Sequence, residues 1–493
     1  MSTQKDYVEV FKSLYDGLTS YQKVLHTASG PTDNPEHYDN QIPTPFNKQF
    51  SKGVWYFLFD EKLAISTTSD NVAKFTTNMK PHGLLRTNIC FQLPHISFKE
   101  GHVGRWTHNV GSNAVASVSC KYNEAPIQTL THIYFDFHTQ TFTSSDQHDS
   151  YQADLGNLPT LTRFQKVLPR HNTSYSIPWF FSKDDSSFFR LCYCSFMDRL
   201  EFEVTYRDTL SKLLQIKQLS DNSNMDFETA GGELVPHNNF TSDLYLIEGR
   251  TPKEMDPPMP KPSMWGKYIY LTDVECQYNI CPPKDEGPRN IFDIDEILVF
   301  ESDEKYKLNY MKQDNNKVLA KKESISSKYP AYIVYAGIRN DTAYSQNYYS
   351  NYSTNSRDHL LGYSPVEDVT ITPQSEMNVV KNVPGWKMER CNARDQFVRA
   401  PFEPGYIAWC GGVKAKSISI IPGNVWEKGS VKVNIRDTNP YHIQGNLGEH
   451  EPDTEYQLVV VLVCNRRLTF TRHPTTDVER GRPDTAAILL SGQ

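Results

Sequence analysis

Apolar and polar residues alternate strictly along one stretch of the chain. In RLEFEVTYR (199–207), every second residue from Leu200 to Tyr206 is apolar, and the residues between them are charged or polar. Successive side chains of a β-strand point to opposite faces, so the pattern predicts a strand with one buried and one solvated face. Phe202 is therefore expected inside a core, and Glu203 at the surface.

Strand-length segments of this kind follow one another along both halves of the chain. The first half contains GVWYFLFDEKLAI (53–65), LLRTNICFQL (84–93), AVASVSCKY (114–122), THIYFDFHTQTFT (131–143) and an aromatic stretch (177–194). The second half contains DLYLIEG (243–249), KYIYLTDVECQY (267–278), DEILVFE (295–301), AYIVYAGI (331–338), GYIAWC (405–410), SISII (417–421), SVKVNIRD (430–437) and YQLVVVLVCNRRLTFTR (456–472). Helical periodicity is weak in the first half, although a short helix is predicted around LPTLTRFQKVL (158–168). Many short strands joined by polar, Pro-rich connections predict an all-β protein built of sandwiches.

An amphipathic helix is predicted near the N-terminus. Six apolar residues recur there at helical spacing: Tyr7, Phe11, Leu14, Leu18, Tyr21 and Leu25. Such an apolar stripe needs a partner surface. The spacing does not identify that partner, and two hypotheses stay open: a helix docked on its own domain, and an arm that contacts another subunit or a layer beneath.

The length of 493 residues exceeds what one β-sandwich needs, so two domains are expected. After Arg207 the alternation gives way to a polar, glycine-containing segment, which predicts the domain boundary. The predicted division is an N-terminal arm with the amphipathic helix (1–45), a first sandwich (46–212), a linker (213–240), a second sandwich (241–475) and a C-terminal tail (476–493).

Composition and charge argue against several classes of protein. A formal net charge of −7 disfavours sequence-independent binding of DNA or RNA by the whole chain. The longest apolar run, LVVVLVC (458–464), is far shorter than the ~20 residues of a membrane-spanning helix. The N-terminal residues lack the apolar core of a signal peptide, which predicts synthesis in a cytosol-like compartment. The nine cysteines are accordingly expected to be mostly reduced, buried thiols.

Three common catalytic motifs are missing from the sequence. The patterns GxxxxGK[ST], GxSxG and HExxH are absent. Fifteen histidines could contribute to a site built from distant segments, but one sequence cannot bring such residues together. We therefore expect a protein that is not an enzyme, with no catalytic residues, no cofactor and no metal site.

Four cysteines are candidates for metal ligands, but their spacing favours other roles. Cys276 and Cys281 are not followed by a second pair at zinc-finger spacing, which disfavours a structural zinc. Cys192 and Cys194 would share one face of a strand, where packing in the core is the favoured interpretation.

Carboxylates give two further candidates for chemistry. Asp293, Asp295 and Glu296 in FDIDE could bind a divalent cation, but a calcium loop needs further oxygen ligands at fixed offsets, so a solvated strand entrance is favoured. A carbohydrate-active enzyme or lectin with β-sandwich modules is the main alternative from another class of protein. An enzyme of that kind would need paired carboxylates about 5 to 10 Å apart. Asp136, Asp293 and Asp295 are the candidates for that pair, although no motif around them supports a catalytic role.

Four N-x-[ST] triplets occur, at Asn172, Asn239, Asn340 and Asn351. A protein without a signal peptide does not meet the secretory glycosylation machinery, so we expect none of the four to carry a glycan.

The segment RNDTAYSQNYYSNYSTNSR (339–357) is rich in Tyr, Asn and Ser and nearly uncharged. It is too polar for a typical core, and long loops on rigid β-scaffolds usually carry recognition or build contacts. Tyrosine offers contact area at a low entropy cost. The composition therefore predicts an exterior loop whose tyrosines either contact a neighbouring subunit or bind a receptor.

Three segments of the sequence resemble the major capsid proteins of nucleocytoplasmic large DNA viruses. The first is IPWFFSKDDSSFFRLCYCSFMDRLEFEVTYRD (177–208), and the others are GRWTHNVGSNAVASVSCKYNEAPI (104–127) and YQLVVVLVCNRRLTF (456–470). The matching positions are Ile177, Pro178, Trp179, Phe180, Trp106, Asn109, Val110 and Gly111. The chain departs from the family pattern at KYNEAP (121–126), where a Gly-Gly turn is usual, and it lacks a glycine-rich tail.

The resemblance implies an all-β fold of two tandem jelly-roll sandwiches, a double jelly roll, with a short N-terminal helical arm. It implies a structural major capsid protein that forms homotrimers, the pseudo-hexameric capsomers of the icosahedral shell of a large double-stranded DNA virus. Expected partners are neighbouring capsomers, minor capsid proteins and an inner membrane reached by the N-terminal arm, with no direct nucleic-acid binding. The expected location is the virion, after assembly in the host cytoplasm. The loop 339–357 would face the exterior.

A scaffolding protein or a minor jelly-roll capsid protein is the alternative within the same class. The amphipathic N-terminal helix is the feature that keeps a scaffold on an assembling membrane open.

Overall fold

The computed structural model describes most of the chain between residues 56 and 489. The described residues are 56–69, 71–182, 188–189, 191, 198–220, 226–228, 231–236, 239–253, 257–271, 289–308, 318–374, 377–412, 415, 423–435, 454–472 and 486–489. The predicted N-terminal helix and the predicted strand 417–421 lie outside them, as do Cys192, Cys194, Cys276 and Cys281.

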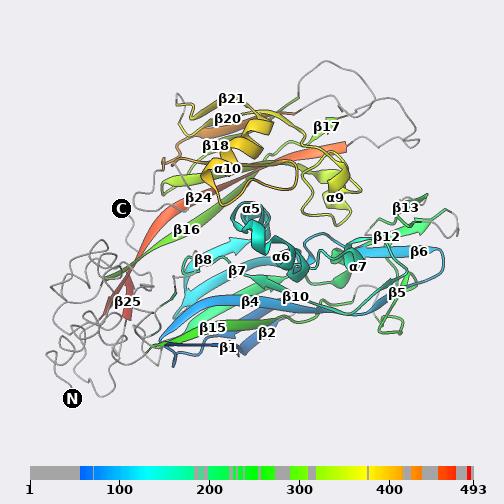
Figure 1. Ribbon diagram of the computed structural model, residues 1–493, viewed down its shortest axis with the longest axis horizontal. Coiled ribbons are helices and arrows are strands. Elements are labelled where there is room, and N and C mark those ends of the chain that lie inside the picture. The colour runs from blue at the N-terminus through cyan, green and yellow to red at the C-terminus, as the bar shows by residue number, and fades with distance from the viewer. Residues whose placement is uncertain are drawn as a thin grey trace.

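The first sandwich consists of a four-stranded and a five-stranded antiparallel sheet (Figure 1). In the order of pairing, the four-stranded sheet contains β1 (Tyr56–Lys62), β15 (Ser263–Leu271), β4 (Gly83–Leu93) and β10 (His171–Ser176). The five-stranded sheet contains β2 (Ala64–Ser69), β3 (Val72–Thr76), β11 (Leu200–Tyr206), β7 (Val115–Tyr122) and β8 (Ala125–Thr131). Two small sheets extend one end of this sandwich: β13 (Gly232–Leu234), β12 (Leu214–Leu219) and β6 (His102–Trp106), and β14 (Tyr245–Ile247), β5 (Ile96–Phe98) and β9 (Val167–Leu168).

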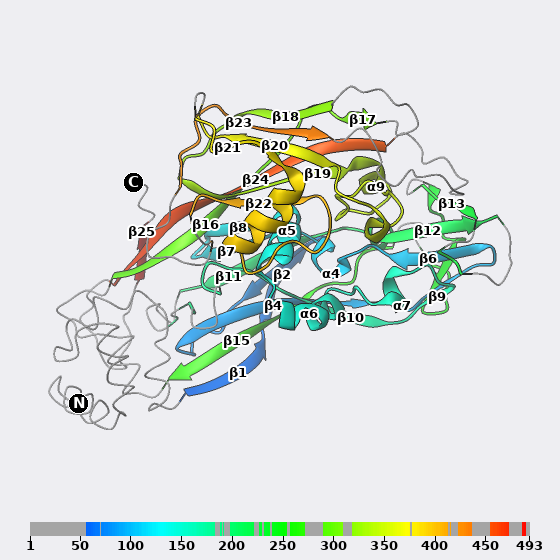
Figure 2. The ribbon, with the colours of Figure 1, turned by 45° about the horizontal axis from the view of Figure 1, so that its top comes forward.

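The second sandwich also consists of two antiparallel sheets (Figure 2). One contains β16 (Arg289–Glu301), β24 (Thr454–Arg472), β19 (Ala331–Asn340) and β22 (Tyr406–Cys410), with β17 (Tyr306–Leu308) and β25 (Ala486–Leu489) also paired to β24. The other contains β18 (Val318–Ile325), β23 (Gly429–Ile435), β20 (Val366–Thr372) and β21 (Val380–Pro384). The prediction of two tandem jelly-roll sandwiches is thus confirmed.

The alternating strand 199–207 is confirmed as β11, whose residues are alternately buried and partly exposed. Phe202 is fully buried and lies between Phe75 of β3 and Cys120 of β7. Its ring centroid is 5.2 Å from that of Trp179, whose indole N–H donates a 2.8 Å hydrogen bond to Thr87 Oγ1. The aromatic stretch upstream therefore fills the core of the first sandwich.

The described residues of that aromatic stretch (177–182, 188–189 and 191) do not form a regular strand, in contrast to the prediction. Its described residues form turns and an isolated bridge between Phe189 and Leu84. Trp179, Phe180 and Phe181 are buried nonetheless. A run of large apolar side chains predicts that the segment is buried, but it does not predict that the backbone is a β-strand.

Strand pairing also differs from the predicted division of the chain. Strand β15, which we assigned to the second sandwich (241–475), pairs with β1 and β4 of the first. Strand β12 lies in the predicted linker (213–240) but pairs with β6, and β25 lies in the predicted tail (476–493) but pairs with β24. Sequence order does not reveal which sheet a strand joins, because a jelly roll pairs strands that are distant in the chain.

The segment 131–143, predicted as a strand, is instead mostly helix α5 (His132–Phe142). Most of its residues are buried, so the helical period of 3.6 residues is hidden, and a short apolar run does not distinguish a buried helix from a strand. Helix α5 lies between the two sandwiches (Figures 1 and 2), where it contacts β7 and β8 on one side and β16 and β22 on the other.

The other described helices are short and lie in connections between strands. They are α4 (Val110–Asn113), α6 (His148–Asp154), α7 (Pro159–Thr162), α9 (Asp341–Ser345) and α10 (Ala393–Gln396), the 3-10 helices η2 (Ser145–Gln147), η4 (Leu210–Leu213) and η7 (His359–Leu361), and the π-helix η8 (Lys387–Asn392). Helix α7 confirms the short helix predicted within 158–168. No helix in the described part of the chain is long and apolar enough to cross a membrane.

One hydrophobic core is continuous from the first sandwich into the second. It contains Phe137 of α5, whose ring lies 5.3 Å from Tyr335 of β19, 5.4 Å from Tyr352 and 5.3 Å from Tyr406 of β22. A second core lies between the two sheets of the second sandwich. Because burial of apolar surface drives folding, the shared core joins the two sandwiches into one packed unit.

Candidate functional site at the interface of the two sandwiches

The connection between β19 and β20 (residues 341–365) packs against the first sandwich. Tyr348, Tyr349 and Tyr352 are only 4%, 6% and 1% exposed. The prediction of an exterior loop at 339–357 is therefore wrong for three of its four tyrosines, which are buried within one chain, while Tyr344 is half-buried. The polar composition was misleading because Asn and Ser side chains can be buried once hydrogen bonds satisfy them.

Hydrogen bonds to the backbone of the first sandwich hold this connection. The Asn347 side-chain amide donates to the carbonyls of Ser211 (3.0 Å) and Leu214 (2.9 Å). The Tyr349 hydroxyl donates to the carbonyl of Lys212 at 2.8 Å, and the Arg207 guanidinium lies 3.7 Å from the centre of the Tyr349 ring. The connection is thus a structural strap between the sandwiches.

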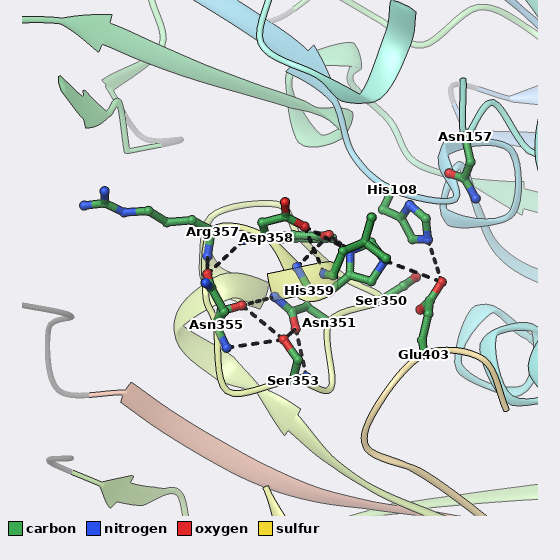
Figure 3. A network of polar contacts seen from close by, with 12 residues as sticks. His108, Asn157, Ser350, Asn351, Ser353, Asn355, Arg357, Asp358, His359 and Glu403 are labelled. Atoms are coloured by element: carbon green, nitrogen blue, oxygen red, sulfur yellow. Dashed lines mark hydrogen bonds and ion pairs between the residues drawn. The ribbon is translucent and has the colours of Figure 1, made fainter. Parts of the chain in front are cut away.

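Two of the four Asn-x-Ser/Thr triplets are built into the strap. The side-chain oxygen of Asn340 caps α9 by accepting from the Ala343 N–H, and its amide donates to the Ser353 carbonyl at 3.0 Å. Asn351 donates to the Asn355 carbonyl at 2.8 Å (Figure 3). Both asparagines are fully buried, so neither can carry a glycan in this fold, whereas Asn172 and Asn239 are exposed.

Asp136 is a buried carboxyl group on α5. It accepts a 2.7 Å hydrogen bond from the Ser350 hydroxyl of the strap. Burial raises the pKa of Asp136 to about 7, and the negative charge of Glu403 acts in the same direction, while the Ser350 hydrogen bond, Arg339 and Arg207 oppose the rise.

Asp295 is buried elsewhere on the interface. Its carboxylate accepts a 2.7 Å hydrogen bond from the Tyr332 hydroxyl, and its backbone carbonyl accepts one of 2.9 Å from the Gln128 amide of β8. These bonds give Asp295 a structural position between β16 and β8. The side chain of Asp293 lies outside the described residues.

Three titratable side chains from distant segments meet in a group that we call the His–His–Glu cluster: His108, His359 and Glu403 (Figure 3). His108 follows β6, His359 opens η7 in the strap, and Glu403 precedes β22. Glu403 Oε1 lies 2.8 Å from His108 Nε2 and 3.6 Å from His359 Nε2. Among the described residues, these three side chains place their potential ligand atoms close enough together to hold a metal ion.

The charges of the cluster depend on its burial. Burial lowers the pKa of His359 to about 4, with a further reduction from the charge of His108, so His359 is neutral near pH 7. Burial opposes ionisation of Glu403, but attraction to His108, together with hydrogen bonds from His108 and Gln140, outweighs that effect and holds the pKa of Glu403 below its ordinary value. The cluster therefore contains a carboxylate beside at least one neutral imidazole.

A pocket of about 500 Å³ adjoins the cluster. The cluster residues line it together with Arg105, Arg163, Glu228 and Asp358. Neither Asp136 nor Asp295 lines it, so these two carboxylates do not form the catalytic pair considered for a carbohydrate-active enzyme in this pocket. The sequence offered no signal for the cluster, because its members are scattered over almost 300 residues without a motif.

The described cysteines bear on the predicted redox state. Cys90, Cys120, Cys391, Cys410 and Cys464 are free thiols. Burial raises the pKa of Cys464 to about 12, so this thiol is protonated and inert near neutral pH. Three of these five residues, Cys120, Cys410 and Cys464, are buried as expected, whereas Cys90 and Cys391 are partly exposed.

No family model matches the sequence, and no curated protein is significantly similar to it. Solved structures do match. VP54 of PBCV-1, fitted into a reconstruction of the virophage Sputnik, has a TM-score of 0.58 at 10% identity, over 89% of this chain and 97% of that chain. The Faustovirus major capsid protein has a TM-score of 0.58 at 8% identity, over 84% of this chain and 90% of that chain. A chain of the Sputnik virophage structure has a TM-score of 0.52 at 9% identity, with 88% of each chain covered.

These similarities extend over both sandwiches. They show that the chain has the double jelly-roll fold found in viral major capsid proteins. At identities of about one residue in ten, the agreement is one of architecture rather than of individual side chains.

Proposed function

We propose that the chain is a structural major capsid protein and a component of the virion of a large double-stranded DNA virus. The observation that carries this proposal is the match to whole capsid proteins: the alignment includes 97% of PBCV-1 VP54 and 90% of the Faustovirus protein. A match to one sandwich alone would be weak support, because single jelly rolls serve many functions.

The proposed unit of assembly is a homotrimer. Two similar sandwiches repeated about a three-fold axis give six similar lobes, and closed cyclic symmetry is common among homo-oligomers. The internal strap supports this arrangement, because it fixes the two sandwiches relative to one another and would make each subunit a rigid tile.

Contacts between copies need apolar surface, and the isolated chain retains some. Leu58 and Trp265, on the neighbouring strands β1 and β15, are 47% and 41% exposed, and Trp386 of the second sandwich is 57% exposed. Aromatic side chains contribute strongly to protein interfaces. We infer that some of these side chains contact neighbouring copies, either within the trimer or between trimers.

Sedimentation velocity of the purified chain over a range of concentrations tests this proposal. We expect a species of about 170 kDa, three times the 56.6 kDa of one chain. A 56.6 kDa species at every concentration would contradict the proposed trimer.

A further inference from the structure

The His–His–Glu cluster brings together ligand atoms from both sandwiches. His108 belongs to the first sandwich, and His359 and Glu403 belong to the second. One ligand atom from each residue lies within 4.8 Å of the other two (Figure 3). A tetrahedral ion with ligands at about 2.0–2.2 Å separates those ligands by roughly 3.4 Å. The 3.6 Å from Glu403 Oε1 to His359 Nε2 is close to that value. The 2.8 Å from Glu403 Oε1 to His108 Nε2 is a hydrogen-bond distance, which would lengthen by about 0.6 Å if an ion replaced the shared proton.

Glu403 is unusual for a carboxylate that merely pairs with a histidine. Its side chain is 1% exposed, and its second oxygen, Oε2, is buried without a hydrogen bond of normal geometry. The neighbouring Gln140 side chain accepts a 3.3 Å hydrogen bond from the Glu403 backbone N–H and helps to lower the pKa of the carboxylate. A buried charged oxygen without a good partner costs free energy, which a bound cation would recover.

The imidazole of His359 is already oriented as a metal ligand. Its Nδ1 is hydrogen-bonded to the Tyr348 hydroxyl, which leaves Nε2 directed toward Glu403. Metal-ligating histidines commonly use the second ring nitrogen in this way, because the outer hydrogen bond fixes both the tautomer and the ring orientation. Tyr348 itself is buried, and Arg105 lies over its ring.

We propose that the His–His–Glu cluster binds one divalent transition-metal ion, with zinc as the first candidate, and that the ion links the two sandwiches. Two imidazoles and one carboxylate suit zinc, whereas calcium and magnesium prefer oxygen ligands alone. The 500 Å³ pocket beside the cluster leaves room for a water molecule as the fourth ligand and gives the ion a route of entry. The proposal does not depend on the capsid function.

Zinc binding by the full-length chain tests the proposal. After treatment with a chelator and its removal, the protein is titrated with ZnCl₂, and binding is followed by calorimetry and by the melting temperature. We expect one ion per chain and a melting temperature that rises with zinc concentration, because an ion that binds only the folded state stabilises it. Co²⁺ in place of Zn²⁺ should give the visible absorption of a four-coordinate site.

Glu403→Gln is the decisive variant, because it keeps the size of the side chain and removes its charge. We expect it to weaken zinc binding by more than about tenfold, since even residues behind the ligands contribute that much. His95→Gln is the matched control: His95 belongs to the first sandwich and does not line the pocket, so its loss should leave zinc binding unchanged. If Glu403→Gln does not fold, His108→Gln replaces it, because His108 is the most exposed of the three ligands, at 11%.

Two results would overturn the proposal. One is a parent protein whose melting temperature does not respond to zinc. The other is equal zinc binding by the parent and the Glu403→Gln variant, which would mean that surface histidines bind the metal. The oligomeric state, measured in the same samples, reports separately on the proposed capsid function.

Discussion

Tyr352→Ala should destabilise the whole chain, because Tyr352 packs at the centre of the interface between the sandwiches. The side chain is 1% exposed, and its ring centroid lies 4.5 Å from that of Tyr406. The Tyr352 ring also packs against the backbone of Gly337. A Cβ atom added to Gly337 would lie only 2.7 Å from the Tyr352 ring, so no side chain fits between them. Burying an aromatic side chain removes about 200 Å² from water. At about 25 cal/mol per Å² this corresponds to roughly 5 kcal/mol. Core substitutions of Phe or Trp by Ala cost about 3–5 kcal/mol.

Unfolding in urea, followed by circular dichroism, measures this effect. A loss of about 3–5 kcal/mol would be a large part of the 5–15 kcal/mol that stabilises a typical domain. Leu361→Ala is the control in the same strap: this leucine is 77% exposed, and its truncation should change the free energy of unfolding by less than about 0.5 kcal/mol. Equal midpoints for the two variants would refute the conclusion that the strap is buried between the sandwiches.

Three further predictions concern the core, the buried acid and the thiols. Phe202→Asp should cost several kcal/mol by placing a carboxylate in the first core, whereas Glu203→Ala removes only surface ion pairs with two lysines and should cost at most about 1 kcal/mol; equal urea midpoints would disprove the register of β11. Because the pKa of Asp136 is about 7 in the folded chain and about 3.9 unfolded, the folded state binds the extra proton between these values, and stability should fall as pH rises from about 4 to 7. Asp136→Asn should remove that fall and be more stable than the parent at pH 8, whereas the exposed Asp146→Asn should retain the parent's profile; no difference between the two would exclude the raised pKa. A mild reductant should leave the melting temperature nearly unchanged, and a large drop would reveal structural disulfides.

Strands with one buried and one solvated face could be predicted from the sequence, because apolar and polar side chains alternate along them. Strand β11 shows this in its alternation, and β24 was found from its long run of aliphatic residues. Helix α5 could not be predicted, since burial on most sides removes the periodic signal. The assignment of β15 to the first sandwich depends on pairing with residues about 180 positions earlier, which local pattern does not encode.

The interface between the sandwiches was the least predictable part of the molecule. The composition of the strap is typical of a polar surface loop. Only the structure shows that its Asn and Ser side chains are buried and form hydrogen bonds. The His–His–Glu cluster is invisible in sequence for a related reason: His108 and Glu403 are almost 300 residues apart and meet only because both sandwiches pack together.

Negative-stain imaging of the purified, full-length protein tests the central claim most directly. A capsid protein with two jelly rolls per chain should form uniform trimeric particles with a hexagonal outline, because three copies present six similar sandwiches. Uniform single-chain particles, at a concentration where the protein is folded and soluble, would contradict the assignment to a capsid shell.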